Sequence, residues 1–260
     1  MDNQLAKQSI NYNQKVVLVT GGSRGIGAAI VKLFLENNYK VIIHYNSNED
    51  KAREIASRFP SERYLLLQGD FTIDNHPHML WEKALKWKGR IDVLINNAAI
   101  MLDLTQAKDL KGIQYIWDTT YKVNVRAVGD LCSFAIQHFK DKQGGIIINM
   151  ASRASFRGDV PDFINYAASK GAIISLTRTI ARGYAQNNIL AYAIAPGLVE
   201  TEMAEEFINK VGRDKLLRDI PLNELVPPEE VANITLLLAS GKVRHSTGAT
   251  FDINGASYVR

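Results

Sequence analysis

Short, continuously apolar runs recur along the chain, and longer segments with helical periodicity separate them. The runs are rich in Val, Ile and Leu and do not alternate with polar residues, which is typical of parallel strands buried on both faces. We expect strands at Val16–Val19, Val41–Ile43, Tyr64–Leu67, Ile91–Ile95, Ile146–Ile148, Leu190–Ile194 and Thr250–Ile253. We expect helices at Ile26–Asn37, Asp50–Arg58, Met79–Trp87, Ile116–Phe139, Tyr166–Ala185 and Pro228–Ala239.

This alternation predicts an α/β fold in which helices cover both faces of a doubly wound parallel sheet and form three layers. Because no linker rich in Pro, Gly or Ser divides the chain, we expect one domain over residues 15–260. Residues 1–14 are predicted to form a flexible polar leader. Ligands bind such sheets beyond the carboxyl ends of the strands, so the residues that follow each strand are the candidate site residues.

The first predicted strand leads into a glycine-rich turn, Thr20–Gly27, with the sequence TGGSRGIG. Gly21 can adopt a turn conformation closed to residues with a Cβ, Gly25 lets the backbone approach a pyrophosphate, and Gly27 lets the next helix pack closely. The N–H groups of that helix N-terminus attract phosphate oxygens. Ordinary turns contain such glycines too. The strand before the turn and the helix after it nevertheless favour a dinucleotide site.

Polar residues after the second strand indicate which dinucleotide binds. NAD-preferring proteins usually place an acid there against the ribose 2′-hydroxyl, whereas this chain has Asn46 and Ser47. Both can donate hydrogen bonds to a 2′-phosphate, and Arg24 in the glycine turn is a cation within reach of it. Arg24 could instead be a solvent-facing turn residue. Together these residues favour NADP(H) over NAD(H).

Asp70 follows the third strand, and Asn96–Ala99 follows the fourth. Asp70 can accept a hydrogen bond from the adenine amino group, or it can cap the next helix. Asn97 and Ala98 suit a backbone that lies against a bound cofactor, because one is an amide and the other is small.

Ser152 follows the fifth strand, and Tyr166 and Lys170 lie further on at positions four apart. On a helix, residues with this spacing share one face. An ammonium beside a phenol lowers the tyrosine pKa from about 10 toward neutrality, where the phenol can exchange protons with an alcohol or ketone. Ser152 can hold the substrate oxygen by a hydrogen bond. The same Tyr and Lys spacing also arises by chance on helices.

Composition and charge count against other functions. The net charge is +4, but Lys and Arg are interleaved with Asp and Glu, which indicates a solvated surface and no nucleic-acid partner. We expect no membrane span and no export signal. His76 and His78 are the nearest approach to metal-ligand spacing, and no metal site is expected. A lone cysteine, Cys132, is expected to be buried, which agrees with a cytoplasmic protein.

Taken together, these motifs resemble the short-chain dehydrogenase/reductase family in its single-domain branch. The resemblance covers residues 15–255 and implies a Rossmann fold. The matching positions are TGGSRGIG for the family's TGxxxGxG, Asn124 for its active-site asparagine, Ser152, Tyr166 and Lys170 for YxxxK, and Pro196, Gly197 and Thr201 for PGxxxT. Ala99 replaces a family glycine, and its added methyl implies a slight shift near the nicotinamide ribose.

The resemblance implies hydride transfer from the nicotinamide to a carbonyl carbon, with Tyr166 as proton donor. It also implies that Lys170 binds the ribose hydroxyls, that Ser152 orients the substrate, and that Asn124 holds a water in a proton relay. The residues expected to contact the cofactor are Gly21, Ser23, Arg24, Gly25, Ile26, Gly27, Asn46, Ser47, Asp70, Asn97, Ala98, Tyr166, Lys170, Pro196, Gly197, Val199 and Thr201.

The segments Tyr45–Glu49 and Ala195–Thr201 resemble the 3-oxoacyl-[acyl-carrier-protein] reductases. Those reductases bind an acidic carrier protein through basic residues in two segments. The first segment corresponds to Lys140–Gln143 and contains lysines here, whereas the second, Tyr184–Asn187, has no cation. Asn254–Ser257 also differs from the usual double glycine. These departures count against an acyl-carrier-protein partner, which stays an alternative. Other small-molecule substrates that stay open are cyclic ketones, quinones and sugars.

Two other classes of function could use this fold. An NADP(H)-binding sensor or scaffold needs no catalysis, but Asn124, Ser152, Tyr166 and Lys170 together argue against it. Sugar-nucleotide epimerases and dehydratases share the Tyr and Lys spacing. They usually have TGxxGxxG and a longer substrate domain, and neither is present here.

Residues 200–222 are predicted to form a substrate lid, because the segment is polar and follows Pro196–Gly197 directly. Its apolar residues Met203, Phe207 and Leu216 would face the substrate, or they would pack on the rest of the domain.

We also expect a homotetramer, on the resemblance and on the apolar content of the two longest predicted helices, Ile116–Phe139 and Tyr166–Ala185. The alternative is that these residues form a deeper core within one chain.

Overall fold

A computed structural model describes residues 15–260, so the predicted leader at residues 1–14 lies outside the described residues. Within residues 15–260, seven parallel strands form one sheet in the order β3-β2-β1-β4-β5-β6-β7. The strands are β1 (Val16–Val19), β2 (Lys40–Tyr45), β3 (Tyr64–Gln68), β4 (Val93–Asn96), β5 (Gly145–Met150), β6 (Ile189–Pro196) and β7 (Thr250–Ile253). The order reverses between β1 and β4, and this reversal creates the crevice in which such sheets bind ligands.

Helices cover both faces of the sheet, as the apolar strands predict. They are α1 (Gly25–Glu36), α2 (Glu49–Ala56), α3 (His76–Lys88), α4 (Leu110–Tyr121), α5 (Ala127–Asp141), α6 (Ala154–Arg157), α7 (Ile164–Tyr184), α8 (Glu202–Val211), α9 (Arg213–Leu217) and α10 (Pro228–Ala239). Short 3-10 turns lie at Ser61–Arg63, Leu104–Gln106, Pro161–Phe163, Ala185–Asn187 and Arg244–Ser246.

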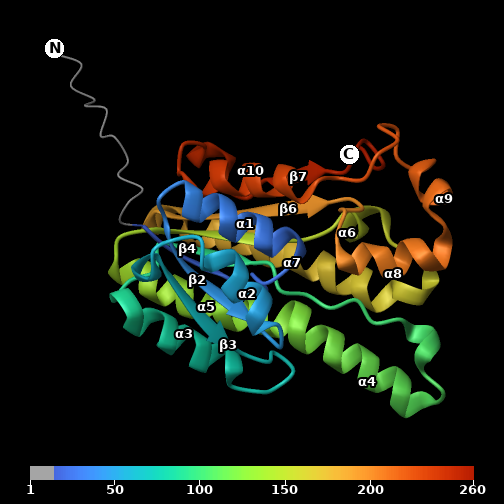
Figure 1. Cartoon of the computed structure of the whole chain (residues 1–260), viewed down its shortest axis with the longest axis horizontal. Helices are drawn as coiled ribbons and strands as arrows, with labels where there is room; N and C mark the ends of the chain where they lie inside the picture. Colours follow the sequence, from blue (N-terminus) through green and yellow to red (C-terminus); the bar gives the residue numbers. More distant parts are fainter. Residues whose placement is uncertain (1–14) are drawn as a thin grey trace.

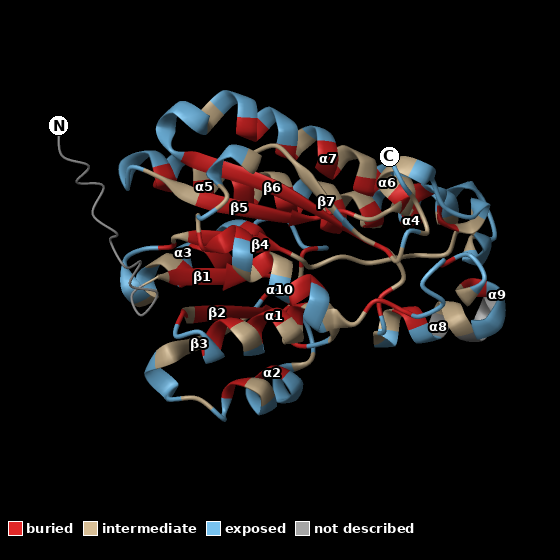
Figure 2. Cartoon of the chain, turned by 90° about the horizontal axis from the view of Figure 1, so that it is seen from above, coloured by how far each residue is buried: buried red, intermediate tan, exposed pale blue. Residues whose placement is uncertain are grey.

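The core consists of two apolar layers, one on each face of the sheet. Helices α3, α5 and α7 pack on one face, and α1, α2 and α10 pack on the other (Figure 1). Successive strand residues point to opposite faces, so Leu18 packs under the first set of helices while Val17 and Val19 pack under the second. Buried residues accordingly concentrate in the sheet and on the inner sides of the helices (Figure 2). The predicted three-layer, doubly wound fold is confirmed.

Cys132 belongs to the layer formed by α5 and has the buried position expected of it. Burial raises the pKa of its thiol to about 12. A thiol with so high a pKa carries little thiolate at neutral pH and is unreactive.

The structure corrects the predicted helix at Ile116–Phe139. That region is formed by α4 and α5 with a π-helical segment between them, Lys122–Arg126. The start lies earlier, at Leu110, because the side chain of Asp109 accepts a hydrogen bond from the Gly112 N–H at 2.8 Å and caps the helix. Single π-helical turns inside helices occur frequently at functional sites, and this one contains Asn124.

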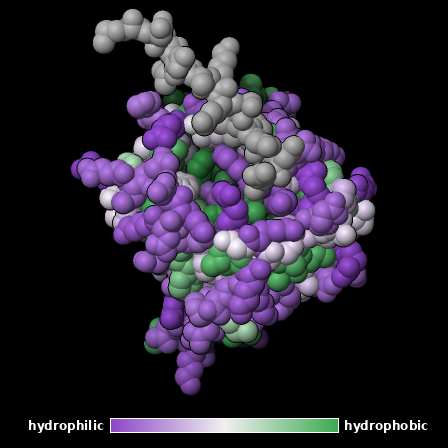
Figure 3. All heavy atoms as spheres, turned by 90° about the vertical axis from the view of Figure 1, so that its left-hand side faces the viewer, coloured by the Kyte–Doolittle hydropathy of each residue, from purple (hydrophilic) through white to green (hydrophobic). Residues whose placement is uncertain are grey.

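The two ends of the molecule differ. The carboxyl ends of the strands face α6, α8 and α9 at one end, on the right in Figure 1. The opposite end is mainly hydrophilic where the grey atoms leave it visible, with smaller hydrophobic areas between (Figure 3). Among the described residues, no helix has both the length and the apolar character needed to cross a bilayer.

Candidate functional site

A cavity of about 350 Å³ opens at the carboxyl edge of the sheet. Its walls come from the glycine turn, the loops after β2 to β6, and helices α7 and α8. Every residue predicted to contact the cofactor lines this cavity, and Ser152 does so too. Several other residues line the cavity that we had not predicted to be site residues, among them His44, Arg153, Asp159 and Glu202.

The glycine turn is tightly packed and adopts a conformation that requires glycine. Gly21 has φ +66°, and a Cβ there would lie 2.9 Å from the Ala98 Cα. A Cβ on Gly27 would lie 2.0 Å from the Gly21 carbonyl oxygen, so this glycine permits the first turn of α1 to rest on the glycine turn itself. The Asn97 amide donates to the carbonyl oxygens of Thr20 at 2.9 Å and of Gly21 at 3.0 Å. The fourth strand therefore fixes the turn through a side chain that we had predicted to contact the cofactor.

The N-terminus of α1 fits a dinucleotide pyrophosphate. Among the described residues, no side chain caps this helix, and its first residues, Gly25, Ile26 and Gly27, line the cavity. Unpaired N–H groups at a helix N-terminus bind phosphate oxygens well. Because glycine has no Cβ, the glycines of this turn leave room for the phosphates to approach the backbone.

His44 is a structural residue of the site that sequence reasoning missed. Its Nδ1 accepts a hydrogen bond from the Gly21 N–H at 3.1 Å, and its Nε2 donates to the Gly69 carbonyl oxygen at 2.9 Å. The ring stacks on Phe71, with 4.4 Å between the ring centres. Burial lowers the pKa of His44 to about 4, so the neutral ring joins the glycine turn to the end of β3.

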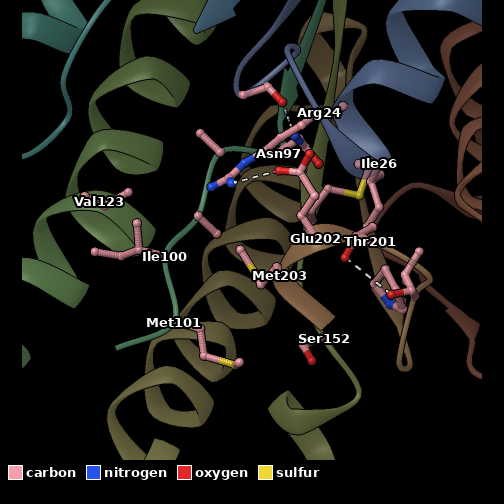
Figure 4. A pocket seen from close by; sticks show the side chains of 18 of the residues that line it. Arg24, Ile26, Asn97, Ile100, Met101, Val123, Ser152, Thr201, Glu202 and Met203 are labelled. Atoms are coloured by element: carbon pink, nitrogen blue, oxygen red, sulfur yellow. Dashed lines mark hydrogen bonds and ion pairs between the residues drawn. The ribbon is translucent and has the colours of Figure 1, made fainter. Parts of the chain in front are cut away.

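In the wall of the cavity, Arg24 forms an ion pair. Its Nη1 lies 3.3 Å from Glu202 Oε2, and the other carboxylate oxygen of Glu202 is bound by the ammonium of Lys51 on α2. Figure 4 shows Arg24 and Glu202 pointing toward each other across the cavity. Arg24 therefore lines the cavity with a protein anion beside it.

Asp70 lines the cavity and does not cap a helix, so that alternative is wrong. Its carboxylate accepts hydrogen bonds from the N–H and hydroxyl of Thr72, at 2.9 and 2.8 Å. The next helix, α3, begins later, at His76. The His76 Nδ1 in turn accepts from the Asp70 N–H at 2.9 Å, so this imidazole holds the loop after β3.

Tyr166 and Lys170 lie one turn apart on α7, beside Ser152 from the loop after β5. The buried face of α7 fixes their direction, because Thr177 on that face accepts a hydrogen bond from the Asn149 amide of β5 at 2.9 Å. The Lys170 ammonium donates to the Met150 carbonyl oxygen at 2.7 Å and lies 5.7 Å from the centre of the Tyr166 ring.

The pKa values of Tyr166 and Lys170 differ from those expected for a phenol beside an ammonium. Burial raises the pKa of Tyr166 to about 12, and a hydrogen bond with Ser152 offsets part of the rise. Burial also lowers the pKa of Lys170 to about 8. The expected lowering of the tyrosine pKa is wrong for this structure, because loss of solvent raises that pKa more than the hydrogen bond with Ser152 lowers it. Tyr166 therefore stays a phenol at neutral pH and can donate a proton.

Asn124 is buried behind the cavity wall, within the π-helical segment. Its amide oxygen accepts from the Ile100 N–H at 2.9 Å, and its nitrogen donates to the Ile100 carbonyl oxygen at 2.9 Å and to the Ser169 hydroxyl at 3.1 Å. In this structure the side chain connects the loop after β4 to α7, the helix that carries Tyr166 and Lys170.

The segment predicted as a lid contains α8 and α9, which the sequence had not indicated as helices. Thr201 caps α8 by accepting a hydrogen bond from the Ala204 N–H. Met203 and Phe207 line the cavity (Figure 4 labels Met203), whereas Leu216 is buried. Phe207 also packs edge-on against Phe163, with 5.9 Å between the ring centres. Met203 and Phe207 are thus available to face a substrate, whereas Leu216 packs within the protein.

Comparisons with known proteins agree with this geometry. The family model described as short chain dehydrogenase matches residues 15–212. A 3-oxoacyl-[acyl-carrier-protein] reductase of Thermotoga maritima is 35% identical over 251 residues, which cover 94% of this chain and 98% of the relative. A 3beta-hydroxysteroid dehydrogenase of Eggerthella lenta is 35% identical over 245 residues, which cover 93% of this chain and 92% of the relative.

Solved structures with the same fold contain nicotinamide cofactors. The structure of ElxO with NADP bound has a TM-score of 0.83 and 29% identity, over 94% of this chain and 98% of that one. A 3-ketoacyl-(acyl-carrier-protein) reductase from Brucella melitensis, complexed with NADH, has a TM-score of 0.84 and 27% identity over the same shares. The chain therefore belongs to the short-chain dehydrogenase family and is an oxidoreductase that acts on CH–OH/C=O groups.

Proposed function

We propose that the protein reduces a ketone to a secondary alcohol with NADPH, and that Tyr166 donates the proton. The observation that carries this proposal is the position of a partly buried phenol, Tyr166, beside Ser152 and Lys170, in the same cavity as a glycine turn that fits a pyrophosphate. The hydride donor, NADPH, and the proton donor, Tyr166, would then act on the substrate from the same cavity.

The residues divide the proton chemistry between them. NADPH, when bound, supplies the hydride. Tyr166, with its raised pKa, keeps its proton at neutral pH until negative charge develops on the substrate oxygen. The Ser152 hydroxyl can donate a hydrogen bond to that oxygen. Lys170, whose pKa is about 8, is largely charged at neutral pH and favours the phenolate that Tyr166 becomes.

The preference for NADP(H) is supported by the residues at the adenosine end. Arg24 supplies a cation in the cavity wall, which Asn46 and Ser47 also line with hydrogen-bond donors, and Lys51 supplies a second cation behind Glu202. A 2′-phosphate carries up to about two negative charges, and charged donors of this kind bind it well.

Two substrate classes have specific support. The reductase relatives favour a 3-oxoacyl thioester, whereas the hydroxysteroid dehydrogenase relative favours a cyclic ketone. The ammonium of Lys140, near the end of α5, lies 4.9 Å from the centre of the Tyr184 ring. An acidic carrier protein that binds Lys140 would have to compete with this contact. Turnover of NADPH and NADH against 3-oxoacyl thioesters, cyclic ketones, quinones and sugars distinguishes these classes.

The assigned role of Tyr166 is tested by Tyr166→Phe. We expect turnover to fall by a factor on the order of 10² or more, because the ring stays and only the proton donor is lost. The dissociation constant for NADPH, measured by fluorescence titration, should change little. Tyr184→Phe removes a hydroxyl from the same helix and is the matched control. Retention of more than about a tenth of wild-type turnover by Tyr166→Phe contradicts the role.

A further inference from the structure

Glu202, the first residue of α8, joins three parts of the molecule. One carboxylate oxygen faces Arg24 of the glycine turn at 3.3 Å, and the other is bound by Lys51 of α2. These hydrogen bonds, the one from Lys51 first, lower the pKa of Glu202, so the carboxylate is charged at neutral pH. Each carboxylate oxygen of Glu202 is thus paired with one cation.

Of the two cations, Arg24 lines the cavity, where a 2′-phosphate would use it, and Lys51 meets the cavity through Glu202. Arg24, Asn46 and Ser47 line the cavity, and Glu202 lines it beside them. A phosphate that approaches Arg24 must either displace the carboxylate from it or lie close to a like charge. Both outcomes cost binding free energy, and neither applies to a cofactor with a 2′-hydroxyl.

The start of α8 also touches the glycine turn at a second point. A Cβ on Gly25 would lie 3.0 Å from the Thr201 Cγ2, so Thr201 packs directly against this glycine. Thr201 is the residue that caps α8. Movement of Glu202 away from Arg24 would therefore act on the first turn of α8, whose Met203 lines the cavity next to it (Figure 4).

We propose that Glu202 is a specificity-determining residue that competes with the cofactor's 2′-phosphate for Arg24 and Lys51, and that NADP(H) loosens the first turn of α8 by displacing it. The inference rests on the proposed NADP(H) site at Arg24. It connects the segment at residues 200–222 to the cofactor. A 2′-phosphate would break the two ion pairs of Glu202, whereas NAD(H) would leave them in place.

The test compares Glu202→Gln with the wild type by calorimetric titration with NADP⁺ and NAD⁺. We expect the dissociation constant for NADP⁺ to fall about three- to tenfold in the variant, since two exposed ion pairs no longer oppose phosphate binding. The constant for NAD⁺ should change by less than about twofold. The difference should shrink when the salt concentration rises from about 0.05 M to about 0.5 M.

Amide hydrogen exchange supplies a readout independent of activity. In the wild type, NADP⁺ should speed exchange in the first turn of α8 relative to NAD⁺, and Glu202→Gln should already exchange at the faster rate without cofactor. Glu205→Gln is the matched control, because it removes the same charge from the same helix N-terminus but not the carboxylate that binds Arg24.

Arg24→Ala separates this inference from the proposed cofactor preference. If Arg24→Ala weakens NADP⁺ selectively while Glu202→Gln changes both cofactors equally, or no more than Glu205→Gln does, the role of Glu202 is overturned and the NADP(H) site stands. If Arg24→Ala weakens neither cofactor selectively, the site of the 2′-phosphate is wrong, and the inference fails with it.

Discussion

At the scale of single residues, the site is built from ionisable side chains whose pKa values are shifted by burial. His44, Tyr166 and Lys170 all have pKa values moved by loss of solvent toward the neutral form. For Tyr166 this keeps the proton on the phenol at neutral pH, and for His44 it favours a neutral ring that both donates and accepts. Such shifts are concentrated at functional sites, but they also make the folded state depend on pH.

His44 should make the protein less stable in acid. The unfolded histidine takes up a proton near pH 6.5, whereas the folded one does so only near its pKa of about 4. Between these values the unfolded state binds more protons, so the free energy of unfolding falls as the pH falls, by about 3 kcal/mol over the whole interval. His44→Gln, which does not titrate, should show a shallower fall in urea unfolding measured from pH 7 to pH 4.

The control for that experiment is His78→Gln, because His78 is more than half exposed beside Glu82. Carboxylates add their own acid dependence to every variant, so the informative quantity is the difference from the wild type. Parallel curves for the wild type and His44→Gln would show that the buried ring does not titrate as argued.

At the scale of elements, the strands and most helices could be predicted from the sequence because their signals are local. The run Val16–Val19 is apolar throughout, and the structure buries it on both sides. The π-helical segment at Lys122–Arg126 could not be predicted, since nothing in its composition separates it from a regular helix. Its Asn124 was found only by resemblance, and its bonds to Ile100 depend on tertiary packing.

Contacts between distant elements explain what the sequence did not reveal at the site. Gly21, Tyr166 and Lys170 belong to motifs with fixed spacing. The partner of Arg24, in contrast, lies 178 positions away in α8, and the partner of His44 lies in the glycine turn. No periodicity or motif relates such pairs. Only the order of the strands brings them to the same edge of the sheet.

The contact between α1 and the glycine turn gives a prediction about Gly27. In Gly27→Ala the new methyl would lie 2.0 Å from a backbone carbonyl oxygen, which cannot rotate away. The start of α1 must therefore shift, and we expect NADPH binding to weaken about tenfold or more and stability to fall by about 1–3 kcal/mol. Fluorescence titration and urea unfolding measure the two effects.

Gly183→Ala provides the matched control within a helix. A Cβ at Gly183 meets nothing within 4 Å, and the residue is exposed near the end of α7. Alanine should stabilise this position by up to about 1 kcal/mol and leave cofactor binding unchanged. Equal effects of the two substitutions on NADPH binding would contradict the close approach described for Gly27.

At the scale of the whole molecule, burial changes the argument for assembly. Most apolar residues of α5 and α7 that we had taken as a sign of a tetramer contact lie in the core of the chain itself, for example Leu131, Phe139 and Ile173. The exposed apolar side chains are found elsewhere. Three of them, Leu110, Ile113 and Tyr115, lie close together in sequence on α4. Leu110 and Ile113 share one side of the helix and Tyr115 lies on another, so α4 offers exposed apolar groups to partner chains on more than one side.

We therefore retain the prediction of a homotetramer and place one of its contacts at α4. Light scattering at micromolar concentration should give about four times the chain mass of 29.0 kDa. Tyr115→Glu should reduce the measured mass, because Tyr115 is 68% exposed in the single chain and a buried, unpaired carboxylate opposes association. Met79→Glu places the same charge on α3, where Met79 is 46% exposed, and should leave the mass unchanged. A wild-type mass of one chain would refute the assembly, and a Tyr115→Glu protein that stays tetrameric would refute the place of the contact.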